Sequence, residues 1–153
     1  MSYDLLFSLV NLSVMPAWAL LILAPKWSVT DRIVHSMFYP LLLGGLYFSL
    51  MIASMAFGVG ASPNDAPVNF TTIDGVRGIF GSDIGVIIGW AHYLVFDLFV
   101  GAWEARDARR RGFRHWLLIP CLLLTFMFGP VGLLLYVILR KVTGKGGWSL
   151  VEN

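Results

Sequence analysis

Four long apolar stretches dominate the pattern of hydrophobic and polar positions along this chain. Residues 5–24, 37–59 and 116–139 contain no Asp, Glu, Lys or Arg, and residues 84–103 contain only Asp97. Each stretch has the roughly 20 residues that an α-helix needs to cross hydrocarbon about 30 Å thick. The pattern predicts an all-α polytopic membrane protein, with four transmembrane helices in a small antiparallel bundle that forms a single domain over residues 1–153. The predicted helices cover about 4–24, 33–59, 83–104 and 116–140.

A soluble four-helix bundle is the main alternative, and the composition argues against it. The chain is 58% hydrophobic and 13% charged, whereas soluble domains average roughly 45–50% apolar and about 25% charged residues. A soluble bundle would also carry charges along one face of every helix, which these stretches lack. The first helix is expected to remain in the mature protein, because the start Met-Ser-Tyr-Asp lacks the basic region of a signal peptide.

The positions of lysine and arginine predict how the helices are oriented. Four helices put the connections after the first and third helix on one side of the membrane, and both termini and the long middle loop on the other. Seven of the eleven Lys and Arg residues fall on the first side, namely Lys26, Arg32, Arg106, Arg109, Arg110, Arg111 and Arg114. We therefore expect this side to be cytoplasmic and both termini to lie outside. The Arg109–Arg111 run indicates topology and contact with anionic lipid headgroups, since no nucleic-acid-binding fold accompanies it.

The middle connection combines a turn-rich part with a short predicted helix. Residues 60–65 read Gly-Ala-Ser-Pro-Asn-Asp, which is typical of a turn. Thr72 then stands where it can cap a helix with Ile73, Val76 and Phe80 on one face. We expect an interfacial segment over the mouth of the bundle. A lid and a plain loop that dips into the headgroups are both compatible with this pattern.

Small residues predict which helix faces meet. In the third helix, Gly89, Tyr93, Asp97 and Gly101 step by four residues along one ridge, where a neighbouring helix can approach closely. Asp97 is therefore expected to face protein rather than lipid. Similar small or polar stripes in the other three helices can converge on the same interior. The prolines at positions 16, 40, 120 and 130 lie in or at the ends of the spans, where kinks can open a cavity.

Two ionisable residues of the third helix are the candidates for chemistry. A charge at membrane depth is costly unless it is paired, so Asp97 marks a functional site or a structural lock between helices. A carboxyl group in hydrocarbon favours its neutral form and can act as a general acid. His92 lies about 140° around the helix from Asp97, so the two do not form a same-face pair. The structural alternatives are that Asp97 locks two helices through Asn11 or Thr125, and that His92 hydrogen-bonds a backbone carbonyl.

The sequence carries no motif for a metal, a nucleotide or serine hydrolysis. His35 and His115 lie near span ends beside basic residues, and no HxxxH or ExxH pair occurs. GxGxxG, P-loop and GxSxG patterns do not occur either. We predict no metal and no cofactor, and leave a haem open as the alternative. The aromatic residues Trp18, Trp90 and Phe96 are compatible with the lining of an isoprenoid site or with plain packing.

Two runs carry a resemblance to a known family. Residues 89–107, which begin Gly-Trp-Ala-His-Tyr-Leu-Val-Phe-Asp, and residues 120–136 resemble the abscisic-acid-deficient-four-like family of membrane proteins, and residues 6–11 and 16–18 extend the resemblance over nearly the whole chain. The resemblance implies a link to neoxanthin synthesis: isomerisation of a carotenoid 5,6-epoxide to an allenic alcohol, without redox change and without a nucleotide. No transit-peptide-like extension precedes the first helix, so we expect a bacterial inner membrane.

The resemblance also implies roles for individual residues. Asp97 is assigned as the acid at the epoxide oxygen and His92 as the base or an orienting residue, and the reverse assignment is nearly as good. The residues expected to bind the substrate are Asn11, Trp18, Trp90, Tyr93, Phe96 and Thr125.

The expected partners are a carotenoid or another hydrophobic isoprenoid and membrane lipids, with no nucleic acid, and a homo-oligomer is left open. A non-catalytic carotenoid-binding, lipid-binding or structural subunit is the alternative function. A small transporter is disfavoured because the chain shows no internal repeat.

Overall fold

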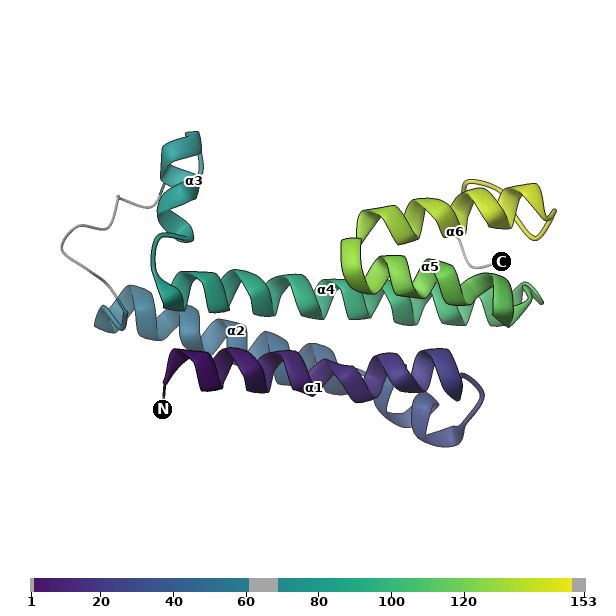
Figure 1. Ribbon diagram of the computed structural model, residues 1–153, viewed down its shortest axis with the longest axis horizontal. Coiled ribbons are helices and arrows are strands. Elements are labelled where there is room, and N and C mark those ends of the chain that lie inside the picture. The colour runs from purple at the N-terminus through teal and green to yellow at the C-terminus, as the bar shows by residue number, and fades with distance from the viewer. Residues whose placement is uncertain (1, 61–68, 150–153) are drawn as a thin grey trace. The chain divides into compact units, whose positions relative to one another are not determined.

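The computed structural model describes residues 2–60 and 69–149, and these residues form six α-helices, one short π-helix and no strand (Figure 1). The elements are α1 (Tyr3–Leu23), η1 (Thr30–Val34), α2 (Phe38–Phe57), α3 (Ile73–Ile79), α4 (Asp83–Arg110), α5 (His115–Phe128) and α6 (Pro130–Val142). The predicted all-α fold class is confirmed for this part of the chain.

Three segments have the length and composition to cross a membrane. They are Tyr3–Leu23, Thr30–Phe57 and Asp83–Arg110, with 21, 28 and 28 residues. Each coincides with one of the first three predicted spans. The predicted bundle of four spanning helices is not confirmed, because the fourth predicted span is divided between α5 and α6.

The division occurs at Gly129 and Pro130. Gly129 has φ +45° and ψ −94°, a backbone conformation that residues with a side chain rarely adopt. Pro130 is the first residue of α6, where its missing N–H costs nothing, but a proline at this point cannot continue α5. The prediction of one helix over residues 116–140 is therefore wrong: Pro130 begins a new helix instead of kinking a continuous one.

Helices α5 and α6 pack directly against each other as a hairpin (Figure 1). A Cβ atom placed on Gly132 would lie 2.1 Å from the backbone nitrogen of Thr125 and 2.5 Å from the carbonyl oxygen of Cys121. With 14 residues, α5 is about 21 Å long, which is less than the roughly 30 Å of hydrocarbon in a bilayer. Neither helix of the hairpin is long enough to cross a membrane alone.

The chain divides into two compact units. The first comprises Met1–Leu12 and Pro40–Val95, and the second comprises Ser13–Tyr39 and Phe96–Asn153. Helices α1 and α4 each begin in the first unit and end in the second. The single domain expected from the sequence stays a prediction.

In the first unit, α4 packs with the start of α1 and with α2. The rings of Phe7 and Trp90 are 5.8 Å apart, and those of Tyr47 and His92 are 5.7 Å apart. Apolar side chains from all three helices are buried there, namely Val10, Leu43, Ile84, Ile87, Ala91 and Leu94.

The short helix α3 begins where the sequence predicts it. The Thr72 hydroxyl accepts a hydrogen bond from the backbone N–H of Gly75 at 3.1 Å, the N-cap that the sequence indicates. Ile73 and Phe80 are 74% and 52% exposed, as an interfacial segment requires. Closure over the bundle mouth stays a prediction, and residues 61–65 of the turn-rich part lie outside the described residues.

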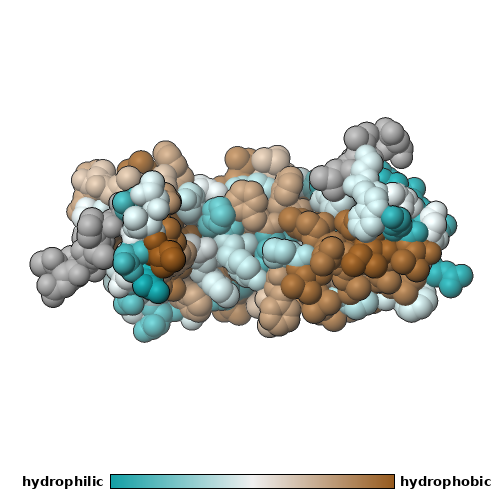
Figure 2. Space-filling model, turned by 90° about the horizontal axis from the view of Figure 1, so that it is seen from above, coloured by the Kyte–Doolittle hydropathy of each residue, from teal (hydrophilic) through white to brown (hydrophobic). Residues whose placement is uncertain are grey.

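In the second unit, the hairpin packs beside the end of α4 and leaves one face of α6 exposed. The residues of that face are Val131, Leu134, Ile138 and Val142. Figure 2 shows the continuous hydrophobic surface that they form over α6. An exposed apolar face of this kind is suited to contact with lipid.

Candidate functional site

The candidate residues divide evenly between the two units. The first unit contains Asn11, Trp90, His92 and Tyr93, and the second contains Trp18, Phe96, Asp97 and Thr125. Asp97 and His92 both lie on α4, which is one uninterrupted helix from Asp83 to Arg110.

In the first unit, Asn11 holds α1 to α4 through a side-chain hydrogen bond. The Trp90 indole N–H donates to Asn11 Oδ1 at 2.8 Å, and Asn11 Nδ2 donates to the carbonyl oxygen of Phe7 at 3.0 Å. The Trp90 ring stacks on Tyr93, with centroids 5.3 Å apart. Among the predicted substrate-binding residues, these three therefore form one connected packing cluster.

His92 and Phe96 lie on exposed positions of α4. The His92 ring contacts Tyr47 of α2, and the residue is exposed overall. Phe96 is 56% exposed. Side chains on such positions of a membrane helix are suited to contact lipid or a ligand dissolved in lipid.

Asp97 is buried in the second unit, only 8% exposed. A Cβ atom on Gly129, in the turn of the hairpin, would lie 2.5 Å from Asp97 Oδ1. The carboxyl group therefore lies directly against the turn between α5 and α6. The prediction that Asp97 faces protein is confirmed.

Glu104 is a buried carboxyl group that was not among the predicted site residues. It is fully buried, and both of its oxygens accept from Thr125 Oγ1, at 3.0 and 3.1 Å. Glu104 follows Asp97 by seven residues, two turns along the same face of α4, and the two carboxyl groups interact electrostatically. The hydroxyl of Thr125, a predicted support for Asp97, is thus bound to Glu104.

The spacing of the acidic residues in the sequence could have identified Glu104 as part of the buried face of α4. The apolar pattern places the end of the third helix at residue 104, where charged residues begin, and predicts a connection over the residues after it. The helix in fact continues to Arg110, because Glu104 and Asp107 turn toward the hairpin. Acids at positions 97, 104 and 107 fit one helical face, so the extension was readable from their spacing.

Asp107 joins α4 to the end of α6 through a buried ion pair. Its Oδ2 accepts from Tyr136 Oη at 2.5 Å and from Arg140 Nη1 at 2.7 Å, and its Oδ1 accepts from Arg111 Nε at 2.7 Å. Arg140 also donates through Nη2 to the carbonyl oxygens of Gly147 and Ser149. Since Arg140 is fully buried, loss of either partner would leave an uncompensated charge. This cluster holds the hairpin against α4.

Trp18 packs against the same stretch of α4. Its ring lies over Gly101, where a Cβ atom would come within 2.5 Å of the ring edge, and it contacts Phe126 of α5 at 5.3 Å. Gly101 therefore lies where another helix approaches, as predicted, whereas Gly89 meets Phe80 instead. The buried Trp18 Nε1 has no hydrogen-bond partner within residues 2–60 and 69–149. It is a donor available to a ligand oxygen.

Histidines outside α4 make local contacts near the helix ends. His115 Nε2 lies 2.8 Å from the carbonyl oxygen of Ile22, and His35 Nδ1 lies 3.5 Å from Arg106 Nη1. Within the part of the chain that the structure describes, His, Cys, Asp and Glu do not gather in threes as a metal site would need.

Comparisons with known proteins agree with the resemblance seen in the sequence. The sequence model of the family described as ABA DEFICIENT 4-like matches residues 5–136. Protein ABA DEFICIENT 4, chloroplastic, of Arabidopsis thaliana is 25% identical over 138 residues, which cover 89% of this chain and 60% of the plant protein. The chain thus spans less than two thirds of that relative's length. No solved structure matches the chain. The match over residues 5–136 shows that this chain belongs to the ABA DEFICIENT 4-like family.

Proposed function

We propose that the protein acts on a carotenoid or a related isoprenoid inside the bilayer and isomerises an epoxide by acid–base catalysis. The family supports the substrate class, and the apolar helices support a reaction in the membrane. The observation that carries the proposal is the placement of Asp97 and Glu104, two buried carboxyl groups, along one face of α4. Buried carboxylates in a membrane helix are costly and are usually retained for a function.

The proposed reaction is an isomerisation in which one proton is added to the epoxide oxygen and another is removed from a carbon. The acid donates a proton to the epoxide oxygen while the base removes a proton from the polyene carbon beside the ring. The electron pair of the broken C–H bond forms the new double bond of the allene, and the ring C–O bond breaks toward the oxygen, which becomes a hydroxyl. Substrate and product have the same composition, so no oxidant or reductant takes part. Positioned acid–base groups contribute typically about 10²–10⁴-fold to such a step.

We assign Asp97 as the acid and Glu104 as the base. Both lie in the second unit, on the face of α4 that the hairpin covers. His92, the base expected from the resemblance, lies at an exposed position in the first unit. Asp97 and Glu104 are seven residues apart in one helix, about 10.5 Å along its axis, so each acts on a different atom of the substrate rather than sharing one proton. Trp18 supports the site as a buried donor for a ligand oxygen.

Pigment analysis tests the function directly. In a bacterial host that makes an epoxy-carotenoid, expression of the chain is expected to lower the epoxide and produce an isomer of equal mass with an allenic group. Extraction, chromatography and mass spectrometry measure both. Binding of the pigment without conversion would favour the alternative function, a carotenoid- or lipid-binding subunit. No change and no binding would contradict the substrate class.

We also propose a bacterial inner-membrane location with a revised topology. The hairpin returns Arg140 to Asp107, so the segment after α6 lies at the same end of the second unit as the α4–α5 connection. Ten of the eleven Lys and Arg residues belong to the second unit and cluster toward that end, whereas Arg77 belongs to the first unit. The ten are Lys26, Arg32, Arg106, Arg109, Arg110, Arg111, Arg114, Arg140, Lys141 and Lys145. Such an excess favours the cytoplasmic side.

Reporter fusions test this topology. A fluorescent protein that folds only in the cytoplasm is expected to fluoresce when fused after Asn153 and when inserted at Gly112. A periplasmic phosphatase fused at the same two positions is expected to be inactive. The four-span bundle predicts an active phosphatase at Asn153 and the same result as the revised topology at Gly112. An active phosphatase at Asn153 would therefore support the original topology, in which both termini lie outside.

A further inference from the structure

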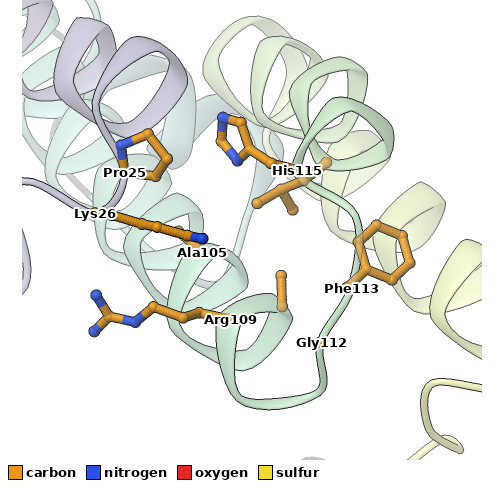
Figure 3. A pocket seen from close by; sticks show the side chains of 9 residues that line it. Pro25, Lys26, Ala105, Arg109, Gly112, Phe113 and His115 are labelled. Atoms are coloured by element: carbon orange, nitrogen blue, oxygen red, sulfur yellow. The ribbon is translucent and has the colours of Figure 1, made fainter.

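A pocket of about 230 Å³ opens at the basic end of the second unit (Figure 3). It lies between the segment that follows α1, the last turns of α4 and the start of α5. The residues that shape it are Lys26, Ala105, Ala108, Arg109, His115 and Leu118. None of them takes part in the proposed acid–base chemistry.

The pocket has an apolar floor and a cationic rim. Ala105, Ala108 and Leu118 are buried in the floor. Figure 3 shows the Lys26 side chain extending across the opening toward Ala105. Lys26 is exposed and makes no hydrogen bond or ion pair with other described residues. It is therefore a cation available to an incoming anion.

The other polar side chains of the rim are held in place. Arg109 Nη1 donates to Asp31 at 2.8 Å in a half-exposed ion pair, which is worth little in such an environment. His115 Nε2 donates to the carbonyl oxygen of Ile22. The Arg109 side chain can therefore reorient toward a ligand with little loss of ion-pair energy. His115 instead holds α5 against the end of α1.

Two exposed tryptophans place the pocket at the level of the lipid headgroups. Trp27 follows Lys26 and is 54% exposed, and Trp116 follows His115 and is 63% exposed. Tryptophans at the ends of membrane segments prefer the interface between headgroups and hydrocarbon. An anion that reaches this pocket from the membrane therefore carries an apolar part that can lie on the alanine and leucine floor.

The charges around the pocket favour an anion strongly. Arg106 and Arg110 lie on α4, Arg114 directly precedes α5, and Arg32 lies on η1. Of the nearby acids, Glu104 is bound by Thr125 and Asp107 by Arg111 and Arg140, while Asp31 offsets part of the charge of Arg109. Basic side chains beside a membrane helix attract anionic lipids.

We propose that this pocket is a specific site for the headgroup phosphate of an anionic phospholipid. The Lys26 ammonium binds the phosphate with help from Arg109, and the glycerol and the first acyl carbons lie over Ala105, Ala108 and Leu118. The site is separate from the proposed catalytic face, so the failure of either proposal leaves the other standing.

Lipid titration of the purified full chain in detergent tests the site. Native mass spectrometry is expected to show one phosphatidylglycerol bound at least tenfold more tightly than phosphatidylcholine. Lys26→Ala is expected to weaken phosphatidylglycerol binding about tenfold, Lys26→Glu more, and Lys26→Arg little. Lys141→Ala is the matched control, since it removes an exposed cation from the same end outside this pocket and is expected to change binding less than twofold.

Three results would overturn the proposal. Equal affinity for phosphatidylglycerol and phosphatidylcholine would show that the pocket does not select an anionic lipid. Equal loss from Lys26→Ala and Lys141→Ala would indicate general charge attraction instead of a site. Competition by millimolar inorganic phosphate that removes the bound lipid would assign the pocket to a soluble anion.

Discussion

Asp97→Asn and Glu104→Gln are each expected to lower conversion of the epoxy-carotenoid by at least about 100-fold, the low end of what a positioned acid or base contributes. Both substitutions keep the size and the hydrogen-bonding capacity of the side chain. Glutamine at position 104 still accepts from Thr125, so the hairpin stays in place. The amide cannot donate an acidic proton or remove one from carbon. Pigment profiles of cells with equal amounts of each protein measure the loss.

His92→Gln is the control for the assignment of the base. It lies on the same helix at an exposed position and is expected to leave conversion within about threefold of the parent chain, since an exposed side chain away from the reacting groups contributes little. The melting temperature of each variant in detergent should match the parent, which separates lost chemistry from lost folding. Full activity of Glu104→Gln together with inactivity of His92→Gln would return the base to His92. Full activity of a stable Asp97→Asn would end the acid role.

Gly132→Ala is expected to destabilise the protein strongly, although it adds only a single methyl group. The new Cβ would meet the backbone nitrogen and the hydroxyl of Thr125, both at 2.1 Å, and the carbonyl oxygen of Cys121 at 2.5 Å. Backbone atoms cannot move aside as a flexible side chain can, so α5 and α6 must separate. Overpacking of this kind costs up to about 3 kcal/mol. Thermal unfolding followed by circular dichroism in detergent measures it.

Gly45→Ala supplies the matched comparison for this result. Gly45 is also within a helix, α2, but among the described residues no atom beyond its own stretch of helix lies within 4 Å of its added Cβ. Alanine is favoured over glycine inside a helix by about 1 kcal/mol, so the melting temperature should stay the same or rise. Equal melting temperatures for the two variants would mean that α5 and α6 do not pack at Gly132.

The parts of the fold that depend on local pattern were predictable from the sequence. Long apolar stretches identified α1, α2 and α4, because a span requires about 20 predominantly apolar residues. The glycine ridge through Gly101 identified the buried face of α4, because small residues mark where helices approach. The Thr72 cap identified α3 from a short-range hydrogen bond. Each signal acts within a few turns of its own helix.

The hairpin and Glu104 depend on what happens between helices, and the apolar pattern does not report it. Residues 116–139 are uncharged throughout, so the hydropathy of this stretch does not distinguish one long helix from two short ones. Only the Gly129–Pro130 pair marks the turn, and a proline inside an apolar stretch more often kinks a helix than ends it. A straight fourth helix would also carry Tyr136 and Arg140 away from Asp107, which in the structure binds both. Glu104 was missed for a different reason, because it lies at the point where the apolar stretch of α4 ends and charged residues begin.

The buried acids of α4 also bear on the order in which the protein is made. Asp97, Glu104 and Asp107 are synthesised before any residue of α5 or α6, and an acid at the centre of a membrane helix costs about 3 kcal/mol when uncovered. Until Thr125, Tyr136 and Arg140 emerge from the ribosome, the end of α4 is a poor membrane segment that must wait at the interface or in the insertion machinery. Docking of the hairpin then commits α4 to the membrane. A chain that ends before Tyr136 would leave Asp107 without Tyr136 and Arg140, and so without the ion pair that holds the end of α4 to α6.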